Sequence, residues 1–140
     1  MSRAVLRLLA AAALANALFL FFGPDLFQYR SFWVSTTGQL AAGAKTILAG
    51  AALLYGARDA RFATVLRTHG ALCAAIGLVY FILPHAQWQG FAQFLFDDYF
   101  ATPAVLPGAG LVCMALSVFW LHAARGPTGT SGLLMASKPA

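Results

Sequence analysis

Charged side chains are scarce in this sequence of 140 residues, and acidic ones are the scarcest. Asp, Glu, Lys and Arg make up 9% of the chain, with four acidic residues against nine basic ones. A soluble globular domain carries about a quarter of its residues as charged ones. Hydrophobic residues make up 61% instead, and the mean hydropathy is +0.76. The composition therefore excludes an ordinary soluble domain and predicts a single integral membrane domain in contact with a lipid bilayer.

The sequence also lacks cysteine-rich and catalytic motifs. Its two cysteines, Cys73 and Cys113, lie inside apolar runs, so no disulfide framework is indicated. There is no CxxC or HExxH motif, no phosphate-binding loop and no nucleophile–His–acid set. His69 and Cys73 are four residues apart and His122 lies on the same side, so a His/His/Cys set or a pair of haem-ligating histidines is conceivable. His122 and Cys113 are about 13 Å apart along one helix and cannot share a metal, and interfacial histidines with cysteines as core fillers are the favoured interpretation. We therefore expect no metal, no cofactor and no enzymatic activity.

Four long apolar segments account for most of the chain. At 1.5 Å per residue, each spans roughly 30 Å, which is the thickness of the hydrocarbon core of a bilayer. None alternates with the two-residue period of a barrel strand, and a lipid-embedded backbone must satisfy its own hydrogen bonds, so we expect helices. The sequence thus predicts an all-α, four-helix transmembrane bundle over residues 1–125. The predicted spans are about 4–22, 38–57, 63–83 and 102–124.

The distribution of basic residues predicts the orientation of the bundle. Seven of the nine flank the spans on the side that carries both termini, whereas three of the four acids fall on the other side. The positive-inside rule then places both termini in the cytoplasm, with the plasma membrane as the expected location. The net charge of +5 is explained by topology, so we expect no nucleic-acid binding. The seven residues are Arg3, Arg7, Arg58, Arg61, Arg67, Arg125 and Lys138.

Both ends of the chain leave alternatives open. Ala13-Leu14-Ala15 fits the small-x-small pattern of a signal-peptidase site. The apolar run continues through Phe22, however, which favours an uncleaved anchor. The Arg-bearing, acid-free N-terminus is also compatible with an organellar inner membrane. Residues 126–140 are dominated by Gly, Pro, Ser and Thr, so we expect a flexible cytoplasmic tail.

The two extracytoplasmic connections are rich in aromatic residues. Lipid anchoring at the interface explains such residues in general, but their concentration on one side favours segments that form a lid or a docking face. We expect a short amphipathic helix from Gln87 to Tyr99 in the second connection. The ten aromatic residues are Phe27, Tyr29, Phe32, Trp33, Trp88, Phe91, Phe94, Phe96, Tyr99 and Phe100.

Lys45 is the one charge deep inside a predicted span. Its Cα lies roughly 12 Å below the outer end of that span. Its ammonium could snorkel toward the outer headgroups, or it could face the bundle interior and mark a site. Depth matching favours a small polar layer in the outer leaflet that would accept an anionic or carbonyl-bearing group. The candidate ligand-binding residues are Lys45, Asn16, Tyr80, Gly77 and Gly110.

Small residues at four-residue spacing predict the helix-packing faces. Such rows allow close helix–helix contact in membranes, where large apolar faces gain nothing over lipid. Lys45 lies beside the row of the second span, so we expect it to face protein. The packing residues are Gly38, Ala42, Thr46 and Gly50 on the second span, and Gly70 and Ala74 on the third.

Three functions follow from these features. The first is a non-catalytic accessory or assembly subunit of a larger membrane complex, bound to other membrane proteins or to its own copies. The second is a binder or transporter of a small lipophilic or anionic molecule at the Lys45 layer. The third, a membrane enzyme that acts on lipid or quinone, is the weakest because no catalytic set is present. The first is the leading expectation.

Overall fold

A computed structural model describes residues 1–22 and 26–125, and every regular element in these two ranges is a helix. The prediction of an all-α fold is confirmed. Four helices are long and apolar enough to cross a membrane, by length and composition. Insertion itself stays a prediction, and the predicted tail lies outside the described residues. The long helices are α1 (Ser2–Phe22), α3 (Thr36–Gly56), α4 (Ala63–Ile82) and α6 (Val105–Ala123).

The ends of these helices differ from the predicted bounds by a few residues, for local reasons. α3 begins at Thr36 because the Ser35 hydroxyl caps it, accepting a hydrogen bond of 3.1 Å from the Gly38 amide. α6 begins at Val105 rather than near residue 102, since residues 100–104 form turns. Pro107 then falls in the first turn of α6, where a missing amide donor costs little.

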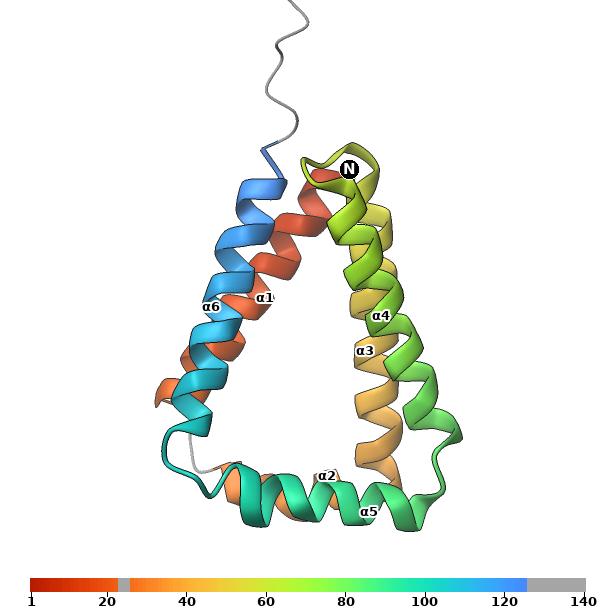
Figure 1. Cartoon of the computed structure of the whole chain (residues 1–140), viewed down its shortest axis with the longest axis vertical. Coiled ribbons are helices and arrows are strands. Elements are labelled where there is room, and N and C mark those ends of the chain that lie inside the picture. Colours follow the sequence, from red (N-terminus) through yellow and green to blue (C-terminus); the bar gives the residue numbers. More distant parts are fainter. Residues whose placement is uncertain (23–25, 126–140) are drawn as a thin grey trace, which may run out of the picture.

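The four long helices pair two by two instead of forming one closed bundle. α1 packs along α6, and α3 packs along α4. Figure 1 shows the two pairs converging at the end where the N-terminus lies and separating toward the other end. We call these the converging end and the cap end. The predicted bundle is thus two helix pairs set at an angle.

Five shorter helices join the long ones, and most lie at the cap end. Two of them, α2 and α5, run across the space between the separated pairs (Figure 1). We call η1, α2, α5 and η3 together the cap. The short helices are η1 (Leu26–Tyr29), α2 (Arg30–Val34), η2 (Ala57–Asp59), α5 (His85–Phe94) and the π-helical η3 (Leu95–Tyr99).

The cap contains the helix that was predicted in the second aromatic connection. The expected range was Gln87 to Tyr99, and the observed α5 begins two residues earlier, directly after Pro84. Its last turns change to π geometry at Leu95. Proline favours an extended residue before it, which is why α4 stops and α5 starts in a new direction here.

The converging end is held by a small apolar core and by polar contacts between the pairs. Leu6 of α1, Leu53 of α3 and Leu66 of α4 are almost fully buried there, together with Trp120 of α6. The Ser2 hydroxyl donates a hydrogen bond of 2.6 Å to the Asp59 carboxylate. The apolar core and this bond fix the two pairs to each other at one end only.

Candidate functional site

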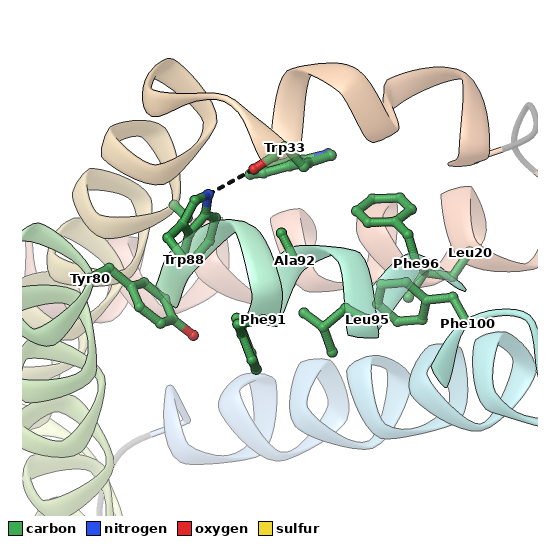
Figure 2. A pocket seen from close by; sticks show the side chains of 10 residues that line it. Leu20, Trp33, Tyr80, Trp88, Phe91, Ala92, Leu95, Phe96 and Phe100 are labelled. Atoms are coloured by element: carbon green, nitrogen blue, oxygen red, sulfur yellow. Dashed lines mark hydrogen bonds between the residues drawn. The ribbon is translucent and has the colours of Figure 1, made fainter. Parts of the chain in front are cut away.

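A cavity of about 260 Å³ lies at the cap end, between the two helix pairs and the cap. Five of the six α-helices contribute to its walls, and so does η3. Figure 2 shows the side chains that line it, with those of α5 and η3 forming most of one wall. The lining residues are Leu20, Trp33, Ala42, Tyr80, Trp88, Phe91, Ala92, Leu95, Phe96 and Phe100.

Trp88 fixes the cap to the rest of the molecule. Its indole nitrogen donates a hydrogen bond of 2.8 Å to the Trp33 carbonyl, and this bond joins α5 to α2 (Figure 2). Its ring meets that of Tyr80 on α4 edge to face, with centroids 5.3 Å apart. Only 4% of Trp88 is exposed. Buried aromatic pairs of this geometry contribute about 0.5–1.5 kcal/mol beyond their burial, so Trp88 is a rigid part of the cavity wall.

Gln39 of α3 holds the end of α4 and the start of α5 in place. Its amide nitrogen donates hydrogen bonds of 2.8 Å to the carbonyls of Tyr80 and Leu83. The last carbonyls of a helix have no partner within that helix, so Gln39 supplies one. Because its amide donates both protons there, its carbonyl oxygen accepts from His85 Nδ1, 3.1 Å away. Gln39 therefore fixes the backbone that presents Tyr80.

An ion pair ties α2 to η3 across the cap. Arg30 donates hydrogen bonds of 2.9 Å and 2.5 Å to the two carboxylate oxygens of Asp97. The hydrogen bonds from Arg30 hold the pKa of Asp97 below its ordinary value, and the same bonds raise the pKa of Arg30. Both side chains are well exposed, so the pair orients the cap more than it stabilises the fold.

Lys45 lies midway along α3 and is exposed, with no hydrogen bond or ion pair to any described residue. The α3–α4 contact is made by Gly43, which is two residues away and therefore about 200° around the helix. Lys45 accordingly points away from α4. It shares a face with Gly56, three turns further along, and Gly56 packs on Leu6 of α1. Lys45 is thus on the side of α3 that faces α1.

The other predicted ligand-binding residues are not gathered around Lys45. Tyr80 lines the cavity. Gly77 lies in the α3–α4 contact, where a Cβ would meet Ile47, and Gly110 lies under the ring of Phe21 in the α1–α6 contact. Asn16 donates a hydrogen bond of 3.3 Å to the sulfur of Cys113 on α6. Gly77 and Gly110 therefore serve packing within each helix pair.

The predicted packing residues have different surroundings in the structure. Gly50 and Gly70 meet in the α3–α4 contact, and Ala74 lies beside them. Gly38 packs on the backbone of α2 near Trp33, where a Cβ would lie 2.7 Å from the Trp33 Cα. Thr46 donates to the Ala42 carbonyl within α3, and Ala42 itself lines the cavity.

Sequence reasoning did not assign the aromatic residues of the cap to a binding site. It placed Trp33, Trp88 and Phe91 in a lid or docking face without naming them as ligand contacts. The usable signal was the spacing of Trp88, Ala92 and Phe96, because residues four apart share one side of a helix. All three are buried and line the cavity.

A second hollow, of about 560 Å³, lies along α4 nearer the converging end. All of its lining residues belong to α4, so within the described chain it is open on the remaining sides. His69 lies beside Trp120 of α6, with ring centroids 5.9 Å apart. The lining residues are Thr64, Val65, Thr68, His69, Leu72, Cys73 and Ile76.

Among residues 1–22 and 26–125, no group of three or more His, Cys, Asp or Glu side chains is placed to hold a metal ion. The described chain contains an apolar cavity with few polar groups, and these groups belong to helices. Pockets that hold small molecules have this composition. The chain matches no known family model, and no curated protein or solved structure shows significant similarity to it.

Proposed function

We propose that this protein is an integral membrane protein that binds a small lipophilic molecule in the cavity at its cap end. The cavity is the single observation that carries this proposal. It is bounded by the separated helix pairs and by a cap that Trp88, Gln39 and Arg30 hold in place. Because its lining residues are almost all apolar, a lipophilic occupant would gain van der Waals contacts along its walls.

The positions of the four long helices support a membrane location for this site. Each is apolar enough to span a bilayer, and the basic residues favour cytoplasmic termini. The cap would then lie at the outer interface, where Trp and Tyr are commonly found. A molecule dissolved in the outer leaflet would reach the cavity without crossing water.

The test introduces a large side chain on one wall of the cavity and measures the binding of a lipophilic probe. The Ala42→Phe variant places a ring in the cavity, because Ala42 lines it from α3. The Ala44→Phe variant is the matched control, since Ala44 is two residues away and exposed on another side of α3. A brominated alkanol serves as the probe, because its bromine quenches the fluorescence of the lining residues Trp33 and Trp88. The proteins are compared in lipid nanodiscs.

We expect saturable quenching in the wild-type protein and in Ala44→Phe, and a loss of at least tenfold in affinity for Ala42→Phe. Thermal unfolding of both variants checks that each is folded. Equal quenching of the three proteins would mean that the probe reports only its partition into lipid, and the proposal would be wrong.

A second candidate function is an accessory subunit of a larger membrane complex. The hollow along α4 favours it, because no other described helix lines that hollow and a helix of a partner protein would fill it. Purification in mild detergent separates the two candidates. A stable larger assembly supports the accessory subunit, whereas a lone chain that retains a small molecule supports the binder.

A further inference from the structure

We propose that the ligand of the cap-end cavity is a lipophilic acid, with a carboxylate bound by Lys45 and Tyr80 and a short apolar body inside the aromatic walls. This inference rests on the proposed function, because it names the chemical class of the molecule that the cavity would hold. Three features carry it: the kind of polar group at the cavity, the direction of Lys45, and the volume.

The polar groups that a ligand could meet at the cavity carry no negative charge. No carboxylate or amide side chain lines it, and the Trp33 carbonyl already accepts from Trp88. The Tyr80 hydroxyl makes no hydrogen bond to a described residue, and Figure 2 shows it at the end of the ring that reaches toward α5. Lys45 adds an ammonium, which can only donate. The Tyr80 hydroxyl can donate or accept, whereas the Lys45 ammonium only donates and repels a cation, so an anionic acceptor fits this set and a charged amine does not.

The geometry of α3 directs Lys45 toward the cavity. Side chains of a helix lean toward its N-terminus and cover the turn before their own Cα. The N-terminus of α3 lies at the cap end, and the turn before Lys45 contains Ala42, which lines the cavity. Lys45 lies on the side of α3 that faces α1, away from α4. Lys45 is not itself among the lining residues, but from this side its long side chain can reach along α3 toward Ala42 and the cavity.

A charge in this position calls for an anionic partner. Lys45 has no ion pair with any described residue, and a lysine at mid-span costs on the order of 2.5–3.5 kcal/mol on insertion scales. A ligand carboxylate would neutralise it. The ligand would then have one acidic end near Lys45 and an apolar body toward Trp88 and Phe91.

The volume limits the apolar body to a short one. At about 260 Å³, the cavity is smaller than the roughly 300–1,000 Å³ typical of pockets for drug-sized ligands. A saturated acid of about ten carbons is smaller than such a ligand, and the tail of a longer acid would extend out of the cavity. The cavity is too small for a whole diacyl lipid.

The experiment compares 10-bromodecanoate with 10-bromodecanol, which has the same body and a neutral end. Both quench Trp33 and Trp88 when bound. Binding is measured in nanodiscs of neutral lipid at pH 8, where the free acid is ionised, and quenching of the Ala42→Phe protein is subtracted as the partition background. Lys45→Met removes the charge with little change in length, Lys45→Arg keeps it, and Tyr80→Phe removes one hydroxyl.

We expect the acid to bind at least tenfold more tightly than the alcohol, as a charge-assisted hydrogen bond would provide. Lys45→Met should remove that preference by weakening acid binding far more than alcohol binding, whereas Lys45→Arg should retain most of it. Tyr80→Phe should weaken both probes by about threefold to tenfold.

The measurements distinguish an error in the proposed function from an error in the assignment of an acid. If neither probe binds above the Ala42→Phe background, the proposed function itself is wrong. If both bind equally and Lys45→Met changes nothing, the cavity binds lipophiles but the assignment of an acid is overturned. Loss of both probes in a Lys45→Met protein that unfolds normally would also overturn it, because Lys45 would then support the cavity and not the carboxylate.

Discussion

At the scale of single residues, glycines allow α3 and α4 to approach each other closely. A Cβ added to Gly50 would lie 2.6 Å from the Gly70 carbonyl oxygen and 2.7 Å from the Ala74 amide nitrogen. Both neighbours are backbone atoms, so neither can move without shifting a helix. Gly43 meets Gly77 in the same way, seven residues further toward the cap end. Glycine is therefore required by the distance between the two helices.

This contact yields a prediction for Gly50→Ala. The added methyl group should push α3 and α4 apart and lower the free energy of unfolding by about 1–3 kcal/mol, as overpacking typically does. Gly108→Ala in α6 is the matched control, because a Cβ there would meet nothing within 4 Å. It should leave stability unchanged or raise it by up to about 1 kcal/mol. Detergent-titrated unfolding followed by circular dichroism measures both, and equal effects would contradict the packing argument.

The glycine contacts also show which part of the packing could be predicted. Small residues in the second and third spans predicted helix-packing faces, but not which helix each face would meet. The predicted row had a spacing of four, from Gly38 to Gly50, whereas the observed contacts recur every seven residues, at Gly43 and Gly50. When two helices cross at a small angle, their contact residues recur with a period near 3.5 residues. Residues spaced by a strict four therefore move progressively around the helix and away from the partner. The crossing angle decides this, and composition does not reveal it.

At the scale of elements, the cap is the part that depends on contacts between segments far apart in the sequence. α2 and η3 meet through Arg30 and Asp97, and α2 and α5 meet through Trp88. The aromatic residues of both connections were recognisable in the sequence, and so was the helix near α5. The cavity between them was not, because it requires the partners across the cap to be known.

The Arg30–Asp97 pair gives a prediction for the mobility of the cap. Asp97→Asn removes the charge and should make α2 more mobile, which a nitroxide spin label at Ser31 would report by electron paramagnetic resonance. Asp98→Asn is the matched control, since the Asp98 carboxylate has no ion pair among the described residues. It should leave the spectrum unchanged. Increased mobility in both variants would show that total charge, rather than this pair, orders the cap.

The same pair sets a pH dependence. Because Arg30 lowers the pKa of Asp97 from its ordinary value of 3.8, Asp97 stays ionised in the folded state at and above that value. The contribution of the pair is fully present above pH of about 4 and is lost as pH falls through the lowered pKa. Mobility at Ser31 should therefore be constant from neutral pH to about pH 4 and should increase at lower pH. Molar salt should also increase this mobility at neutral pH, because it screens the ion pair.

At the scale of the whole molecule, the arrangement is two rigid helix pairs joined at one end and held apart at the other. The core of Leu6, Leu53 and Leu66 closes the converging end, and the cap spans the opposite end (Figure 1). Hydropathy predicted the four long helices because length and apolar content are sufficient for that. It did not predict the separation of the pairs, since this follows from the side chains that fill each end.

The arrangement also carries a prediction about topology. If the four candidate spans all cross the membrane, both termini lie on one side, and the positive-inside rule predicts that the seven basic residues keep that side in the cytoplasm. A fluorescent protein fused after Lys138 should therefore fold and fluoresce in bacterial cells, whereas alkaline phosphatase fused there should be inactive. A phosphatase fused after Ala101, behind the cap, should be active because it would be exported with three spans before it. Phosphatase activity at Lys138 together with inactivity at Ala101 would show that the orientation in the membrane is the reverse of the predicted one. It would also place the cavity and Lys45 in the cytoplasmic leaflet, so that a lipophilic acid would have to enter from that side.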